Sequence, residues 1–342
     1  MASQPSSPRV LLPPRIAMEG DAPDGVVLQL EGACMGTTWR ARVVAEGHEQ
    51  ARALQAGIAA VLEEIEAQMS HFRPASPLRR FGELAAGEWM PLSPQFAQVM
   101  RAALSVAQAS DGAFDPAAAA LIEAWGFGAG QRFVDAGFAP PAVAPSPSAC
   151  WRRLQLDAQD RLRQPGGVAL NLAAIAKGFA VDAVSRWLAQ QGYAHHLVEV
   201  GGELRGTGMK PDLQPWWVAL EAPADNCDLP ATRIALHGLA VATSGDYRRS
   251  YHHAGRRLQH TIDPRSGAPV RHTLAAVSVV HEECMLADAW ATAIMVLGPR
   301  DGLALAEQQG LRALLQWPDE TGRWQEASSA AFNALVAEPE HA

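Results

Sequence analysis

Residues 243–267 concentrate side chains that can do chemistry. The stretch opens with Thr-Ser-Gly-Asp-Tyr at 243–247 and closes with His-Thr-Ile-Asp-Pro-Arg-Ser-Gly at 260–267. Glycine, aspartate and proline mark loops, and loops on a rigid scaffold often carry binding and catalytic groups. The hydroxyls, aspartates, histidine and arginines of this stretch therefore predict a functional arm. The alternative is an ordinary polar hairpin tip.

A second pattern, at residues 171–178, suits the binding of phosphate. It reads Asn-Leu-Ala-Ala-Ile-Ala-Lys-Gly, so small residues lead into a helix. Small side chains let a ligand approach the backbone, and a helix N-terminus offers free N–H groups and positive partial charge. Lys177 adds a full positive charge, although the glycine spacing of a P-loop is absent. The alternative is a junction packed by alanines, with Lys177 in solvent.

A third pattern places a carboxylate and a hydroxyl in an otherwise apolar helix. Asp288 and Thr292 are four residues apart, so their oxygens share one helix face. A carboxylate is costly to bury without a partner, and oxygen ligands of these kinds suit Mg²⁺. The alternative is that Asp288 caps the helix while Thr292 bonds to a carbonyl one turn earlier.

Weaker patterns occur at Asp-Gly-Ala-Phe-Asp-Pro (111–116) and Gly-Gly-Glu (201–203), both of which are turn signals first. The adjacent histidine pairs at 195–196 and 252–253 are poor metal sites, because neighbouring strand residues point to opposite faces.

Composition bounds the function. The 342 residues are 48% apolar and 19% charged, with a net charge of -8 and no basic stripe, so nucleic-acid binding is not expected. The four cysteines lie far apart without zinc spacing, which fits a reducing compartment. No signal peptide and no apolar run long enough for a membrane span are visible. We expect a cytoplasmic protein, or a periplasmic one if the start is misassigned.

The elements that must position these groups alternate between helices and strands. Apolar spacing predicts helices at 50–69, 94–109, 177–190, 286–297 and 303–309, with Ser93 as an N-cap before Pro94. Strands are expected at 26–30, 39–44, 154–156, 168–172, 193–200, 216–220, 234–236, 239–242 and 274–280. A turn at 34–37 joins the first two strands. No strict βαβ rhythm is present, so we predict an α+β fold with mixed β-sheets flanked by helices.

The domain organisation follows from the same reading. We expect a disordered N-terminal head at 1–25, a single domain at 26–330 and a C-terminal tail at 331–342. A proline-rich connector is expected at 138–148.

Taken in order, the segments resemble the ApbE family of FAD:protein FMN transferases, from about residue 30 to 310. The matching pieces are 35–38, 111–116, 125–128, 174–178, 181–182, 201–203, 243–247, 260–264 with Gly267, and 287–289 with Thr292. No piece is decisive alone, but their order is highly specific. The resemblance implies an ApbE-like fold with two interleaved subdomains.

The resemblance also implies a reaction. The family cleaves the FAD pyrophosphate with Mg²⁺ and moves FMN onto a Thr or Ser hydroxyl of a target protein, releasing AMP. Mg²⁺ would sit on Asp288, Thr292 and the carbonyl of Ala174, with Ala291 close by. His260 would be the proton-accepting base, acting with Asp288, and Asp263 would orient its loop. The implied FAD contacts are Met35, Ala113, Phe114, Asp115, Asn171, Lys177 and Ile262.

Two departures keep other readings open. Asn171 stands where many relatives carry Asp, and an amide both donates and accepts whereas ionised Asp only accepts. Many relatives carry a lipoprotein signal, and none is visible here. The alternatives are an FAD pyrophosphatase that gives FMN and AMP, and an FAD-binding protein without turnover. The acceptor protein and the roles of residues 243–247 stay open.

Overall fold

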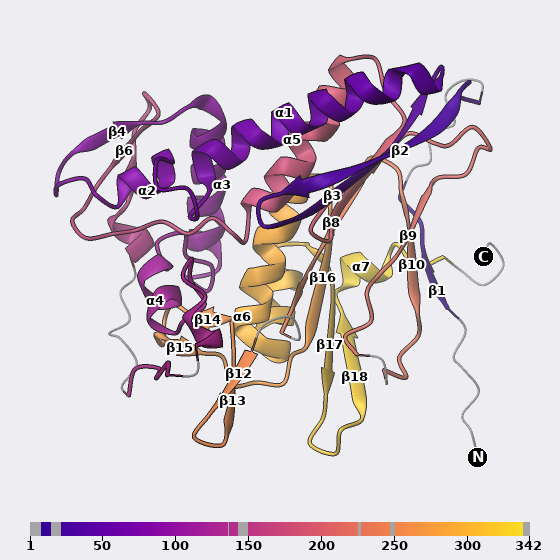
Figure 1. Cartoon of the computed structure of the whole chain (residues 1–342). Coiled ribbons are helices and arrows are strands. Elements are labelled where there is room, and N and C mark those ends of the chain that lie inside the picture. Colours follow the sequence, from indigo (N-terminus) through magenta and orange to yellow (C-terminus); the bar gives the residue numbers. More distant parts are fainter. Residues whose placement is uncertain are drawn as a thin grey trace.

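A large antiparallel sheet forms the centre of the fold (Figure 1). The computed structural model describes residues 8–14, 22–135, 137–142, 150–224, 227–246 and 250–337. The sheet's strands are, in spatial order, β18 (Trp324–Ser328), β17 (Arg312–Pro318), β16 (Ala276–His281), β11 (Leu239–Gly245), β8 (Glu203–Thr207), β7 (His196–Val200), β3 (Thr37–Ala45) and β2 (Val26–Cys34). Each neighbouring pair is antiparallel.

Both faces of this sheet are covered, because successive strand residues point to opposite sides. Val43 and Val279 pack into the main core, whereas their neighbours Val44 and Val280 pack into a second apolar cluster. The main core lies under three long helices, α1 (Ala51–Met69), α5 (Ala176–Gln190) and α6 (Cys284–Gln308). The second cluster lies under a small sheet, β1 (Arg9–Leu11), β10 (Thr232–Leu236) and β9 (Trp216–Ala219), and under α7 (Ala330–Asn333).

A lobe beside the long helices holds most of the remaining elements and shares the main core with them (Figure 1). Its strands are β4 (Trp89–Pro91), β5 (Gln155–Leu156) and β6 (Arg161–Arg163), and its helices are α2 (Pro77–Phe81), α3 (Pro94–Ala109) and α4 (Ala119–Ala124). Two hairpins, β12 (Ser250–His253) with β13 (Arg256–Gln259) and β14 (Ile262–Asp263) with β15 (Ala268–Pro269), form the arm, residues 250–269. Short 3-10 turns lie at His48–Gln50, Arg132–Val134 and Cys150–Arg153.

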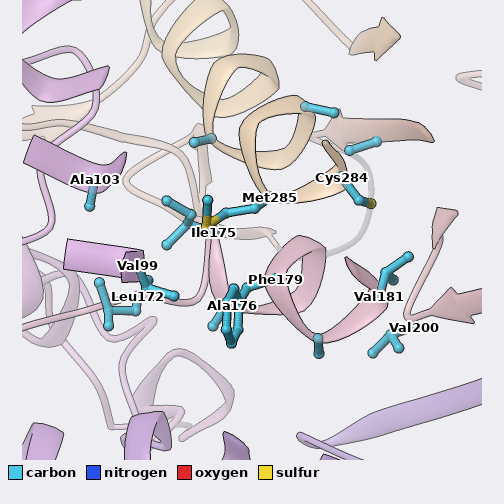
Figure 2. Close-up of a cluster of buried hydrophobic side chains, with 14 of the residues drawn as sticks. Val99, Ala103, Leu172, Ile175, Ala176, Phe179, Val181, Val200, Cys284 and Met285 are labelled. Carbon is cyan, nitrogen blue, oxygen red and sulfur yellow. The ribbon is translucent and has the colours of Figure 1, made fainter. Parts of the chain in front are cut away.

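The crossing of α5 and α6 brings the predicted phosphate and metal patterns together. A Cβ on Gly178 would lie 2.3 Å from the Cys284 carbonyl oxygen, so only glycine allows this approach. Asp182 on α5 caps α6, because its carboxylate accepts from the N–H groups of Cys284 (3.1 Å) and Met285 (2.9 Å). Figure 2 shows apolar side chains of α3, α5 and α6 meeting beside this crossing.

Most predicted elements are confirmed. Helix α3 begins after Ser93, whose hydroxyl accepts from the Phe96 N–H (3.1 Å). The helices expected at 286–297 and 303–309 form one long helix broken at Gly298 (φ 83°) and Pro299. The α+β class is also confirmed. The large sheet is antiparallel throughout, whereas the β1-β10-β9 sheet is mixed. The division into two interleaved subdomains stays a prediction.

Three expectations need correction. Residues 168–172 do not form a strand, because the Val168 N–H and carbonyl bond to the side chain of Gln164 instead of to a neighbouring strand. The disordered head is wrong for residues 9–11, which form β1 along β10 and bury Leu11. The expected tail begins too early, because α7 and Leu335 pack into the second cluster. Of the proline-rich connector, residues 143–148 lie outside the described residues.

Candidate active site

The centre of the candidate site is a buried ion pair between Lys177 and Glu203. Lys177 lies in the first turn of α5, and Glu203 opens β8 after the Gly201–Gly202 turn. Glu203 is only 2% exposed, and burial raises the pKa of its carboxyl to about 7 although Lys177 opposes the shift. The charge of Asp288 raises it further. Within the described residues, Glu203 Oε2 is buried without a hydrogen-bond partner.

Asp288 stands next to this pair, one turn into α6. Its side chain is 4% exposed and accepts from the Gly178 N–H at 3.2 Å. Burial raises the pKa of the carboxyl, while Lys177 and the Gly178 N–H lower it. One lysine therefore faces two buried carboxyl groups, so the site has room for further positive charge. Because α6 begins at Cys284 and is capped by Asp182, the alternative that Asp288 caps the helix is wrong.

Hydroxyl groups of α6 and β11 meet one helical turn beyond Asp288. Thr292 lies one turn further along the same helix face, and its Oγ1 is 3.2 Å from Ser244 Oγ on β11. Thr243 Oγ1 is 2.8 Å from Ser278 Oγ on β16, so it ties two strands together. The first residues of the 243–247 segment thus lie against α6, whereas Tyr247 is outside the described residues.

The turn between β2 and β3 lies on the other side of Lys177. Met35 has a positive φ of 50°, and its N–H donates to Glu66 Oε2 of α1 at 2.9 Å. A Cβ on Gly201 would lie 2.9 Å from Thr37 Cγ2 and 3.4 Å from Lys177 Cδ. The structure therefore brings the Met35 turn, the Gly201–Glu203 turn and the start of α5 together.

The loop at 111–116 is bound to the segment that leads into α5. The Asn171 N–H donates to the Pro116 carbonyl oxygen (2.8 Å), and Asn171 Oδ1 accepts from the Ala173 N–H (2.9 Å). Ala113, Phe114 and Asp115 are all buried, and Asp115 Oδ1 accepts from the Ala117 N–H (2.7 Å). These three side chains are engaged by the fold, so the loop offers a ligand mainly its backbone.

The arm carries the predicted base on an aromatic cluster. Ile262 is buried with Leu121, Trp125 and Phe127. The His260 ring meets the Phe127 ring edge-on, with centroids 6.3 Å apart. The carboxylate of Asp263 pairs with Arg265 (2.9 Å), which stiffens the turn after it. Strand β14 contacts α6, so this cluster borders the helix that bears Asp288 and Thr292, with Ala291 buried between them.

The structure adds Glu203 and Phe72 as candidate site residues that the sequence did not predict. Glu203 looked like part of a turn, and its significance comes from Lys177, which is distant in sequence but bonded to it. Phe72 is 44% exposed, and its Cε2 lies 4.0 Å from where a Cβ on Gly36 would stand. An exposed aromatic ring beside a ligand turn can stack on a flat ring. Its exposure, unusual for a large apolar residue, is visible only in the fold.

The donor set around Asp288 fits a hard cation. Among the described residues, no three His, Cys, Asp or Glu side chains converge as metal ligands. The oxygens that α6 presents on this face are the Asp288 carboxylate and, one turn further on, the Thr292 hydroxyl. Mg²⁺ suits few protein oxygens because it keeps waters and phosphate oxygens as further ligands. Within the described part of the chain, no helix is long and apolar enough to cross a membrane. The compartment stays a prediction.

Comparison with known proteins gives concordant matches. The ApbE family model matches residues 35–315. An FAD:protein FMN transferase of Vibrio cholerae is 32% identical over 319 residues, covering 91% of this chain and 93% of the relative. One of Escherichia coli K12 is 31% identical over 289 residues, covering 83% and 82%. The apo crystal structure of the flavinyl transferase ApbE of Pseudomonas stutzeri has a TM-score of 0.81 at 35% identity, covering 92% and 98%. The chain therefore belongs to the ApbE family.

Proposed function

We propose that this protein transfers FMN from FAD to a hydroxyl group of a partner protein and releases AMP. Membership of the family supports this activity, since the relatives named above are FAD:protein FMN transferases and the similarity extends over most of their length. The observation that carries the proposal is the meeting of Lys177, Glu203 and Asp288 at the α5–α6 crossing. A pyrophosphate needs positive charge where its bridging bond breaks.

Asp288, Thr292 and the carbonyl of Ala174 would hold Mg²⁺, with Ala291 beside them. Asp288 is the one carboxylate of the set, and its ionised form is disfavoured by burial in the absence of a cation. Ser244 holds the Thr292 hydroxyl at 3.2 Å and so positions it. Bound Mg²⁺ supplies positive charge to the pyrophosphate oxygens.

FAD would lie between the Met35 turn, the 111–116 loop and the arm. Lys177 and the start of α5 would face its phosphates. Ala113, Phe114 and Asp115 would offer backbone groups. Asn171 would offer its side-chain NH₂, because only its Oδ1 is used in the turn with Ala173. Ile262 and the exposed ring of Phe72 supply apolar surface for the flavin or adenine ring.

His260 would take the proton from the attacking hydroxyl. The Thr or Ser oxygen of the acceptor bonds to the phosphorus of the FMN half, and the bond between the two phosphates breaks as AMP leaves. Half-buried His260 stands on the arm and contacts Phe127. A histidine positioned this way can accept a proton near neutral pH, and Asp263 holds the following turn.

The test is to incubate the protein with FAD, Mg²⁺ and threonine-containing acceptor domains, and to follow the acceptor mass and the AMP. Covalent FMN on an acceptor with matching AMP is the expected result. Free FMN and AMP with no labelled acceptor would select an FAD pyrophosphatase. FAD binding with no cleavage under any condition would select a flavin-binding protein.

A further inference from the structure

A groove on the arm stands outside the machinery described so far. We call it the hairpin groove. It has a volume of about 520 Å³ and lies between the β12–β13 hairpin and the tip of the β17–β18 hairpin, which extend from the same end of the molecule (Figure 1). The residues of it that matter here are Trp125, Arg256, Arg257, Gln259, Arg271 and Trp324. The volume is in the range of ligand sites.

The groove is positive although the chain is acidic. Three arginines and one aspartate, Asp246, are the lining residues that carry charge, against a net charge of -8 for the whole chain. His272 also lines it, but burial lowers the pKa of its ring, so it adds no charge at neutral pH. Such a local reversal of sign attracts an anionic partner.

The arginines divide into one that builds the groove and two that face solvent. Arg257 Nη1 donates to Asp246 Oδ2 (2.7 Å) and its Nη2 to the Asp246 carbonyl oxygen (2.8 Å), which fixes the hairpin to the end of β11. Arg256 and Arg271 are exposed and form no ion pair with any described residue. Two guanidinium groups are therefore left for carboxylates of a partner.

A buried amide favours a polypeptide over a simple anion. Gln259 is 5% exposed and lines the groove; its Nε2 donates to the Val270 carbonyl oxygen (3.2 Å). Its Oε1 has no donor among the described residues. Free phosphate groups mainly accept hydrogen bonds, whereas a peptide brings carboxylates for the arginines and N–H groups for an amide oxygen. The flanking indoles of Trp125 and Trp324 add apolar contact surface.

The groove is lined by residues that adjoin segments of the candidate active site in the chain. Gln259 directly precedes His260, and Asp246 follows the β11 segment whose Ser244 bonds Thr292. Trp125 Nε1 donates to the Gly267 carbonyl oxygen (2.8 Å) behind Ile262. A chain seated in the groove is thus adjacent to the proposed base.

We propose that the hairpin groove binds an acidic segment of the acceptor protein, next to the hydroxyl that receives FMN. This inference rests on the proposed function for its biological meaning. It assigns Arg256 and Arg271 as determinants of acceptor affinity that have no part in FAD cleavage.

The test measures binding and transfer separately. The probe is a short fluorescein-labelled peptide with one central threonine flanked by glutamates, titrated with the full chain and followed by anisotropy. Counter-probes carry glutamine or lysine in place of every glutamate. We expect the glutamate peptide to bind most tightly and the lysine peptide least, with the preference fading at high salt. The Arg256→Glu/Arg271→Glu variant should weaken binding of the glutamate peptide roughly fivefold to thirtyfold.

The matched control is Arg52→Glu, which changes an exposed arginine of α1. Helix α1 lies at the opposite end of the molecule from the two hairpins (Figure 1). The control variant should bind like wild type, and both variants should keep wild-type affinity for FAD. Equal binding of all three peptides, or an unchanged double variant, would overturn the proposal. So would AMP binding that depends on Arg256 and Arg271 in a protein that binds no peptide.

Transfer to the same peptides is read by mass. Charge-dependent binding without any FMN transfer would support the binding role of the groove and contradict the proposed transferase activity. Transfer without a charge preference in binding would support the transferase activity and contradict the role of the groove.

Discussion

The buried charged cluster of the site and its exposed arm are built in different ways. This buried cluster consists of Lys177, Glu203 and Asp288, which come from α5, β8 and α6; both carboxyl groups are buried. The arm, residues 250–269, consists of two small hairpins attached through an aromatic cluster and a few hydrogen bonds. Charges that must face a pyrophosphate stand on rigid elements, whereas groups that must meet a protein stand on a surface extension.

Substitutions in the two regions should therefore have different effects. Substitutions in the buried cluster alter the charge balance of a buried site, so they should change the rate of the reaction and the pH dependence of stability. Substitutions in the arm should act on proton transfer and partner binding while the core stays folded. The experiments below can break this division or sharpen it.

The largest effect is expected at Asp288. Asp288→Ala should abolish metal-dependent AMP release, because it removes the one carboxylate of the proposed metal site, while the core packing around α6 remains. The measurement is the rate of AMP release at saturating Mg²⁺, with thermal unfolding as the check on folding. Asp288→Asn, which keeps shape and the acceptor for the Gly178 N–H, should be equally inactive. An unchanged rate in either variant would remove the metal assignment.

His260→Ala should slow transfer by roughly a hundredfold or more, since a positioned base typically contributes that much. FAD affinity should change little, because the ring stands on the arm against Phe127. The two quantities are read from single-turnover transfer rates and from quenching of flavin fluorescence. His253→Ala, which changes an exposed histidine in the preceding β12–β13 hairpin, is the control. Equal losses in rate and in affinity would argue for a binding role instead.

Because of Glu203, the buried cluster should make the free energy of unfolding depend on pH, an effect that the arm lacks. Burial raises the pKa of this carboxyl to about 7 in the folded protein. In the unfolded chain the carboxyl ionises at its ordinary, lower pKa, so the folded state binds the extra proton between these values. The free energy of unfolding of the metal-free protein should therefore fall as pH rises from about 4.5 to about 7. Urea denaturation across that range measures it.

In Glu203→Gln this part of the pH dependence should flatten, because glutamine does not titrate. Glu199→Gln, on the neighbouring strand β7, should keep the wild-type curve. A Glu203→Gln curve identical to wild type would mean that the carboxyl ionises normally in the fold.

The smallest effect is expected in the attachment of the arm. Trp125→Phe removes the hydrogen bond to the Gly267 carbonyl oxygen (2.8 Å) and leaves that oxygen without its donor. The loss should be about 1 kcal/mol and should appear as faster hydrogen exchange in 262–267, with α6 unaffected. Hydrogen exchange that rises equally in α6 would show that the arm and the buried cluster unfold as one unit.

Local patterns predicted the helices well and the long-range pairings poorly. The spacing of apolar residues was enough for α1 and α3, and Ser93 before Pro94 was enough for the start of α3. Strand β1 escaped because its partner β10 lies more than two hundred residues away, and three residues carry no period of their own. The expected strand at 168–172 failed because Gln164 takes up its backbone groups, which no periodicity reveals.

The site divides along the same line. Lys177 and the Asp288–Thr292 pair stood out because their helical context is local. Glu203 did not, because its meaning depends on an ion pair that forms only when α5 packs beside β8. Arg256 and Arg271 likewise gain a role only when two hairpins form a groove between them.

The proposed role of Asp288 in the buried cluster is tested most directly by locating the metal. Crystals grown with FAD and with Mn²⁺ in place of Mg²⁺ would locate the ion by its anomalous signal. We expect a peak about 2.0–2.2 Å from an Asp288 carboxylate oxygen, and no such peak in Asp288→Ala crystals. A strongest peak that does not touch Asp288, or one retained in the variant, would contradict this role.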